Sequence, residues 1–179
     1  MHWTKRTPVA VAFIIVSCEM PTGEFENPLD VEAAEEKGII PPALVFFPDS
    51  VSVPVGSSVS IQVFAMEVKN LTGARVHMTY NNANLSLSSV KAGDLFKGST
   101  EPLFFYEDDA TSGTLDIFTF YLGTDSASVS GTGNLANLIF STTARGQSVL
   151  QYTPESELVD PDDIPIEIKG FGEGSIDAR

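Results

Sequence analysis

Short runs of β-branched and aromatic residues dominate the chain from Ile39 onward, and clusters of Gly, Asn, Asp and Ser separate them. No amphipathic stretch of helical length intervenes, and this pattern is typical of a β-sandwich or barrel. The clearest run spans 57–67, where Val59 and Ile61 alternate with Ser60 in the period of two that a strand requires. We therefore predict an all-β fold.

Nine segments have strand character. They are 43–47, 57–67, 75–80, 85–92, 103–106, 114–122, 133–142, 147–152 and 170–176. Prolines fall at the ends of these segments or between them, where a missing backbone donor costs least. We predict one domain over residues 41–179, and a domain of about 140 residues can enclose a core without disulfides.

The composition excludes several classes of function. A formal net charge of −14 and a pI near 4.3 disfavour binding to nucleic acid or to an anionic membrane surface. The chain has two histidines, His2 and His77, and one cysteine, Cys18, so Ser-His catalysis, Cys-His catalysis and a Cys/His zinc site lack their parts. We predict a protein that is not an enzyme.

The first seventeen residues are typical of an export signal, with Lys5 and Arg6 before a short apolar stretch over 8–16. That stretch is too short to span a membrane as a helix. Ser17-Cys18 at its end resembles the bacterial lipobox, which implies lipidation of Cys18. We expect an exported, lipid-anchored protein of the cell envelope that contacts the membrane only through its anchor; a buried free cysteine is the alternative.

An acidic segment follows Cys18. Residues 19–38 contain seven acids, one base and two prolines, a composition that favours an extended, self-repelling chain. We predict a tether over residues 18–40. A short helix within 30–37 is compatible with Asp30 as its cap, although so short a helix is marginal in isolation.

Seven segments of the domain combine turn residues with short apolar runs. They are Val55 to Ile61, Thr72 to Arg75, Tyr80-Asn81-Asn82 with Leu85, Val90 to Leu95, Gly113-Thr114-Leu115, Ser130 to Phe140, and Gly170 to Ile176. In this order and spacing, they together resemble the cohesin domain of bacterial cellulosomes. The resemblance implies a nine-stranded jelly-roll sandwich without catalytic activity. It also implies that a sheet of four strands binds a dockerin or another protein partner.

Transferred by position, the resemblance places Arg75, His77 and Thr79 on that binding sheet, together with Val149 and Gln151. Two positions differ from dockerin-binding cohesins. Arg75 stands where an acidic residue is frequent, and Asn81-Asn82 stands where the family has Asp-Pro after the tyrosine. Both differences separate this chain from the usual mode of dockerin recognition.

The segment 114–122 is apolar on both faces, so its register stays open at this stage. One parity carries Ile117, Thr119 and Tyr121, which we take as candidate partner-binding residues. The other parity carries the set Phe118, Phe120 and Leu122. We add Tyr106, from a nearby aromatic run, to the candidates, because exposed apolar patches mark partner sites. A covering loop is the alternative.

Two acidic clusters remain, at 107–109 and 160–163. Calcium prefers oxygen ligands from loops, so Asp160, Asp162 and Asp163 form a speculative calcium site. Solvated turns are the alternative for both clusters. No pair of carboxylates stands out as the catalytic pair of a glycosidase.

These observations favour a non-catalytic module that binds a protein partner and is linked to polysaccharide degradation. Two alternatives remain. Direct binding of a glycan would use Tyr106 and Tyr121, although the only tryptophan, Trp3, lies in the export signal. The third possibility is a structural subunit of an envelope assembly.

Overall fold

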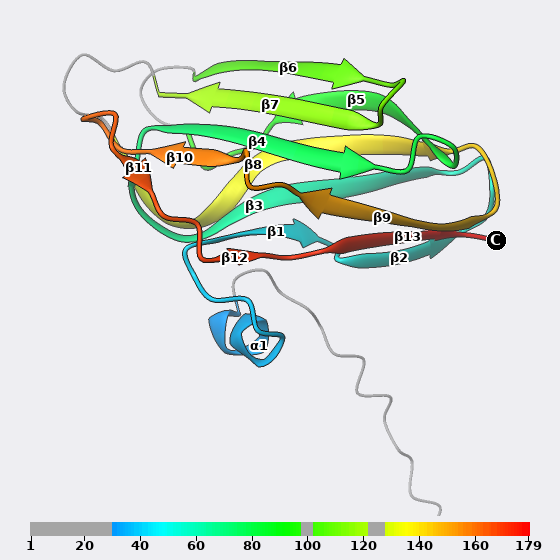
Figure 1. The fold of residues 1–179 in the computed structure, drawn as a ribbon, viewed down its shortest axis with the longest axis horizontal. Coiled ribbons are helices and arrows are strands. Elements are labelled where there is room, and N and C mark those ends of the chain that lie inside the picture. Colours follow the sequence, from blue (N-terminus) through cyan, green and yellow to red (C-terminus); the bar gives the residue numbers. More distant parts are fainter. Residues whose placement is uncertain (1–29, 98–101, 122–127) are drawn as a thin grey trace, which may run out of the picture.

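The computed structural model of the chain describes residues 30–97, 102–121 and 128–179, and its strands form two packed sheets (Figure 1). The first sheet has the spatial order β12-β1-β3-β8-β5. Its strands are β1 (Ala43–Phe47), β3 (Ser58–Leu71), β5 (Leu85–Ala92), β8 (Val129–Thr142) and β12 (Gly170–Phe171).

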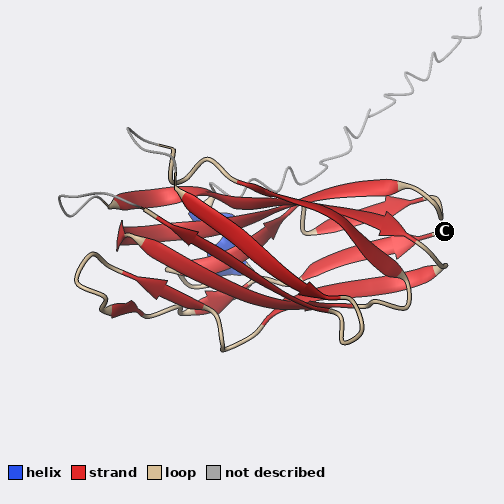
Figure 2. Cartoon of the chain, turned by 90° about the horizontal axis from the view of Figure 1, so that it is seen from above, coloured by secondary structure: helices blue, strands red, loops and turns tan. Residues whose placement is uncertain are grey.

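The second sheet has the order β11-β10-β4-β9-β13-β2, and β7 joins it by pairing with both β4 and β6. Its strands are β2 (Ser50–Val53), β4 (Gly73–Tyr80), β6 (Leu103–Asp109), β7 (Thr114–Phe120), β9 (Gly146–Tyr152), β10 (Glu157–Val159), β11 (Pro165–Ile166) and β13 (Gly174–Ala178). Figure 2 shows the strands along the long axis of the domain, with the helix partly hidden behind them.

The hydrophobic core lies between the two sheets, where alternating side chains of both inner faces meet. Its largest fully buried members include Leu44, Ile61, Leu115, Phe140 and Leu150. Each such side chain contributes about 1.5–3 kcal/mol by leaving water. The alternation predicted for 57–67 is confirmed, since Val59, Ile61, Val63 and Ala65 are all buried.

The predicted all-β sandwich is confirmed, and each of the nine predicted segments contains a strand. The count of nine is too low, because the described residues form thirteen strands. The three short strands β2, β10 and β11 were missed.

The predicted strand 170–176 is in fact two strands. Strand β12 pairs with β1 in the first sheet, whereas β13 pairs with β9 and β2 in the second. The chain crosses between the sheets at Gly172 and Glu173. Strands β1 and β2 make the same crossing, around Pro48 and Asp49, so the two crossings lie side by side.

Helix α1 (Val31–Glu36) begins at Asp30, whose carboxylate accepts a hydrogen bond from Ala33 N at 3.1 Å. Ala34 is buried and packs with Val45 and Met66 on the first sheet, and Figure 1 shows α1 below β1. The helix falls within the segment 18–40, which we predicted as an extended tether. It forms there because Ala34 provides a small apolar surface that packs on the first sheet.

The rest of the predicted N-terminal region lies outside the described residues. This applies to the export signal 1–17, to Cys18 and to the tether residues up to 29. Leu122, at the end of the predicted strand 114–122, also lies outside the described residues. Within the described ranges, no helix is long and apolar enough to cross a membrane.

Candidate functional site

Four adjacent strands, in the order β9-β4-β7-β6, present one exposed face of the second sheet, which we call the outer face. On β4, Val76 and Met78 are fully buried, whereas Arg75, His77 and Thr79 are partly exposed. Successive side chains of a strand point to opposite sides, so these three residues lie on the outer face. Their predicted orientation is confirmed, and their role in binding stays a prediction.

Strand β9 behaves as the resemblance implied. Leu150 and Tyr152 are buried, whereas Val149 is half-buried and Gln151 is exposed on the outer face. The amide of Gln151 donates a hydrogen bond to Glu173 Oε2 at 2.9 Å. The predicted orientation of Val149 and Gln151 is therefore confirmed.

The sequence left the orientation of β7 open, and the structure turns the opposite set of residues outward from the one among our candidates. Ile117 is 0% exposed and Thr119 is 2% exposed, because Ile117 pairs with Val76 on the core side of β4. Phe118 and Phe120 are half-buried and lie on the outer face instead. The prediction that Ile117 and Thr119 lie on the partner-binding face is wrong.

The two tyrosines among the candidates lie off the outer face. Tyr121 packs against the core, with its ring centroid 6.3 Å from that of Phe96, so its predicted place on the binding face is wrong. Tyr106 pairs with Ile117 on the inner side of the sheet but remains 45% exposed at the margin. The two rings do not form the open aromatic strip that the glycan alternative needs.

An apolar strip that the candidate set left out crosses the outer face. It consists of Leu103 and Phe105 on β6 with Phe120 and Phe118 opposite them on β7. Leu103 and Phe105 are 45% and 42% exposed, and the rings of Phe105 and Phe118 stack at 4.6 Å. The alternation of Phe118 and Phe120 was the available signal, but both parities of β7 are apolar.

A glycine extends this strip across β4. A Cβ on Gly73 would lie 2.5 Å from Phe120 Cδ1 and 3.0 Å from Val159 Cγ2. The Phe120 ring therefore lies over the bare backbone of Gly73 and approaches β10. Any larger residue at this position would displace the ring and change the shape of the outer face.

Arg75 is the main cationic group beside the strip. Its Nε donates to Asp116 Oδ1 at 2.9 Å, and its Nη2 lies 3.7 Å from Glu155 Oε2. The guanidinium carbon lies 5.7 Å from the centre of the Phe118 ring, within the range of a cation–π contact. The outer face thus combines an apolar strip with one cation whose charge two carboxylates balance.

His77 is held in place by its neighbours. Its Nδ1 forms a hydrogen bond with Thr153 Oγ1 at 2.7 Å, and its Nε2 lies 3.8 Å from Asp116 Oδ2. The side chain is only 14% exposed. These contacts indicate a structural role for the ring at the bottom of the outer face.

The cluster at 160–163 forms a turn between β10 and β11. Asp160 Oδ1 accepts hydrogen bonds from the backbone N–H groups of Asp162 and Ile164, each at 2.9 Å, and Asp163 has a positive φ of 60°. Among the described residues, no group of three or more His, Cys, Asp or Glu side chains is placed to hold a metal ion. The calcium site predicted at Asp160, Asp162 and Asp163 therefore finds no support.

The acidic cluster at 107–109 ends β6. Asp108 accepts a hydrogen bond from the hydroxyl of Tyr80 at 2.7 Å. Hydrogen bonds, first of all from Ser112, lower the pKa of the Asp109 carboxyl. Glu107 is exposed on the outer face, so the acids form a charged end of the edge strand.

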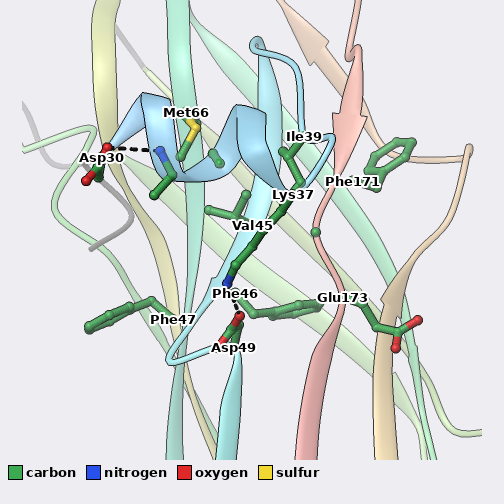
Figure 3. A pocket seen from close by; sticks show the side chains of 13 residues that line it. Asp30, Lys37, Ile39, Val45, Phe46, Phe47, Asp49, Met66, Phe171 and Glu173 are labelled. Carbon is green, nitrogen blue, oxygen red and sulfur yellow. Dashed lines mark hydrogen bonds and ion pairs between the residues drawn. The ribbon is translucent and has the colours of Figure 1, made fainter. Parts of the chain in front are cut away.

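A separate pocket of about 340 Å³ lies on the other side of the sandwich, between α1 and the edge of the first sheet (Figure 3). Ile39, Val45 and Met66 form apolar walls, and the ion pair of Lys37 with Asp49, at 3.0 Å, lies at one side. None of the residues predicted for binding lines this pocket.

Several solved structures with a similar fold are cohesins. The non-cellulosomal cohesin of the archaeon Archaeoglobus fulgidus is 20% identical, with a TM-score of 0.63 over 76% of this chain and 90% of that one. The sixth cohesin of scaffoldin B from Acetivibrio cellulolyticus, in complex with a Cel5 dockerin, is 20% identical, with a TM-score of 0.65 over 76% and 98%. The OlpA cohesin of Clostridium thermocellum, in complex with Doc918, is 16% identical, with a TM-score of 0.62 over 76% and 98%.

No curated protein sequence matches the chain. The model of the cohesin domain family matches residues 44–162, which is more than half of the chain and includes most of the core strands and the outer face. The chain therefore belongs to the cohesin family.

Proposed function

We propose that this cohesin domain is a non-catalytic binding module whose outer face engages a protein partner with a dockerin-like apolar surface. The apolar strip with Arg75 at its side carries the proposal, because an open aromatic cluster beside an arginine is typical of the residues that dominate binding energy. Two of the similar cohesins, from Acetivibrio cellulolyticus and Clostridium thermocellum, are in complexes with dockerins, which supports a partner of this kind.

The partner should differ in detail from the usual one. Arg75 is already paired with Asp116 and Glu155, so a partner must accommodate this network. Asn82, at a position that differs from the family, donates to the carbonyl oxygens of Ala110 and Thr111 at 3.0 and 2.7 Å. Asn82 therefore ties two turns together at the end of the outer face.

The decisive experiment compares two matched double variants. Arg75→Glu/Phe105→Ser changes the outer face, whereas Lys91→Glu/Phe171→Ser makes the same changes on the first sheet, where Lys91 is exposed and Phe171 is 40% exposed. Both variants alter one cation and one exposed phenylalanine. Differences in their binding then report the location of the partner rather than the type of substitution.

Isothermal titration with the Cel5 dockerin and with Doc918, followed by pulldown from envelope and secreted fractions, measures the binding. We expect the outer-face variant to lose at least about tenfold in affinity, or 1.4 kcal/mol, while the first-sheet variant binds as the wild type does. Equal recovery of the same partners by both variants would show that the outer face is not the binding site.

We also propose that the module is anchored to the cell envelope through a lipid on Cys18. The sequence of the first eighteen residues supports this. The described chain begins at Asp30, and α1 packs on the first sheet, so the N-terminal segment meets the domain on the side opposite the outer face. Such an anchor would leave the outer face accessible. Metabolic labelling with a fatty-acid analogue tests it: label should appear on the wild type and disappear in Cys18→Ser.

A further inference from the structure

Strand β6 lies at the edge of the second sheet. It pairs with β7 along its whole length, and in the described part of the chain no strand pairs with its other side. Figure 1 shows β6 at the upper margin of the domain. Six of its seven residues are exposed, and its pairing with β7 shows no bulge. A regular exposed edge of this length is a ready template for another strand.

Hydrogen bonds of β7 show which backbone groups of β6 are free. Tyr80 N–H donates to Gly113 O, and Tyr121 N–H donates to Thr72 O, each at 2.8 Å. In an antiparallel strand, the N–H and C=O groups of one residue point to the same neighbouring strand, and those of the next residue point to the other side. Odd-numbered residues of β7 therefore direct their backbone groups toward β4. Even-numbered residues of β7 therefore direct theirs toward β6.

The residues of β6 opposite these even-numbered residues are Leu103, Phe105, Glu107 and Asp109. Their backbone groups bond to β7. The N–H and C=O groups of the remaining residues, Phe104, Tyr106 and Asp108, consequently point along the free edge. An added strand would find a donor and an acceptor at each of these three residues.

The side chains along this edge divide into two halves. Leu103, Phe105 and Tyr106 are between 42% and 45% exposed and offer apolar contacts. This half contains none of the lysines, prolines or bulges that natural proteins use to block an edge. The other half is acidic, and none of the ion pairs between described residues involves the acids at 107–109.

A second copy of this chain is a poor occupant of the free edge. Two β6 strands paired through Tyr106 would place Glu107 opposite Phe105, and Asp108 opposite Phe104, so each acid would face an aromatic ring. Both copies would also carry a net charge of −14, which disfavours their association. A partner strand with basic residues at one end and apolar residues at the other fits both halves.

We propose that the free edge of β6 binds an extended peptide as an additional antiparallel strand, a mode known as β-augmentation. The peptide has basic residues at its amino end, because an antiparallel strand begins beside Asp109, and β-branched or apolar residues beside Leu103 to Tyr106. This binding uses the unpaired backbone groups of β6 and shares only the side chains of Leu103 and Phe105 with the outer face, so it does not rest on the proposed function.

Tyr106→Pro tests the proposal with little disturbance of the sheet. Proline removes the N–H of residue 106, which points along the free edge, and proline is tolerated at such positions. Tyr106→Thr is the control, since it loses the same ring but keeps the N–H. Protection of the Phe105 and Glu107 amides from hydrogen exchange verifies that β6 still pairs with β7 in both variants.

The probe is a synthetic peptide of about nine residues, a usual strand length, with lysines at its amino end followed by alternating valine and threonine. Binding is followed by fluorescence anisotropy and by hydrogen exchange of the protein amides. We expect slower exchange at Phe104, Tyr106 and Asp108, and an affinity for Tyr106→Pro at least about tenfold weaker than that for Tyr106→Thr.

If Tyr106→Pro disrupts the pairing of β6 with β7, a second peptide tests the same hydrogen bonds on the wild-type protein. This peptide is methylated at the backbone nitrogens that face β6. It should fail to bind the wild-type protein. Equal affinity of the two variants with β6 intact, equal binding of both peptides, or unchanged exchange at Phe104, Tyr106 and Asp108 would each overturn strand addition.

Discussion

Removal of one hydroxyl from two buried tyrosines should have opposite effects on stability. Tyr152 and Tyr80 are 8% and 5% exposed, and each ring packs in the core. The hydroxyl of Tyr152 has no hydrogen-bond partner among the residues that the structure describes, whereas that of Tyr80 donates to Asp108 at 2.7 Å. Tyr152→Phe and Tyr80→Phe are therefore the same chemical change in two different environments.

The magnitudes follow from the cost of an unpaired group. A buried polar group without a partner costs about 1–3 kcal/mol, so Tyr152→Phe should raise the free energy of unfolding by about 1 kcal/mol. The ring of Tyr152 keeps its stack on Phe46, at 4.1 Å, in the variant. Tyr80→Phe should lower the free energy of unfolding by about 1 kcal/mol, because a net hydrogen bond is lost and Asp108 is exposed to water.

Urea denaturation and thermal unfolding measure this difference of about 2 kcal/mol. For a domain of this size, 1 kcal/mol corresponds to about 2–4 °C in Tm, so the two variants should differ by about 4–8 °C. An unchanged slope of free energy against urea would show that the unfolded states are comparable. The reasoning is refuted if Tyr152→Phe is the less stable of the two, as a water bound to that hydroxyl would cause.

Three further predictions concern the core and the helix. Burial raises the pKa of Tyr80 and of Tyr152 above the unfolded value of about 10, so stability should be fully present below that pH and fall as pH rises above it. The double variant with Phe at both positions should lose less stability in alkaline urea titrations, and an equal loss would contradict this. Phe140→Ala should cost about 3–5 kcal/mol in urea denaturation because Phe140 is 0% exposed, and a loss below about 2 kcal/mol would indicate a loosely packed core. Asp30→Ala should cost about 1 kcal/mol through loss of the cap on Ala33 N, whereas Asp30→Asn should keep most of it; equal midpoints for the two variants would argue against the cap.

On the outer face, the polar and apolar pattern of the sequence predicts the orientation of β4 but not that of β7. On β4, polar Arg75 and His77 alternate with apolar Val76 and Met78, so the sequence allows only one orientation. On β7 both parities are apolar, and a shift of one residue exchanges the faces at no cost that the local sequence reveals. The pairing of Ile117 with Val76 decided the orientation, and such a pairing forms only when the two strands meet.

Helix α1 is a second element that depends on tertiary contacts. The sequence contains an N-cap at Asp30 and a short run compatible with a helix, but isolated helices of six residues are marginal in water. Contacts of Ala34 with Val45 and Met66, which come from distant strands, stabilise it. Without knowledge of those strands, an extended tether was the reasonable expectation for this part of the acidic segment.

The sequence by itself determined that this chain forms an all-β fold, because a period of two and the placement of turn residues are local properties of the chain, and the resemblance to cohesins implied that its strands form a sandwich. It also determined the orientation of strands with one polar face. Only the tertiary structure decided that Phe118 and Phe120 face outward, that the chain crosses between sheets at Gly172 and Glu173, and that Phe104, Tyr106 and Asp108 line a free edge. These features depend on which strands become neighbours, and the free energy of those contacts belongs to residues far apart in the chain.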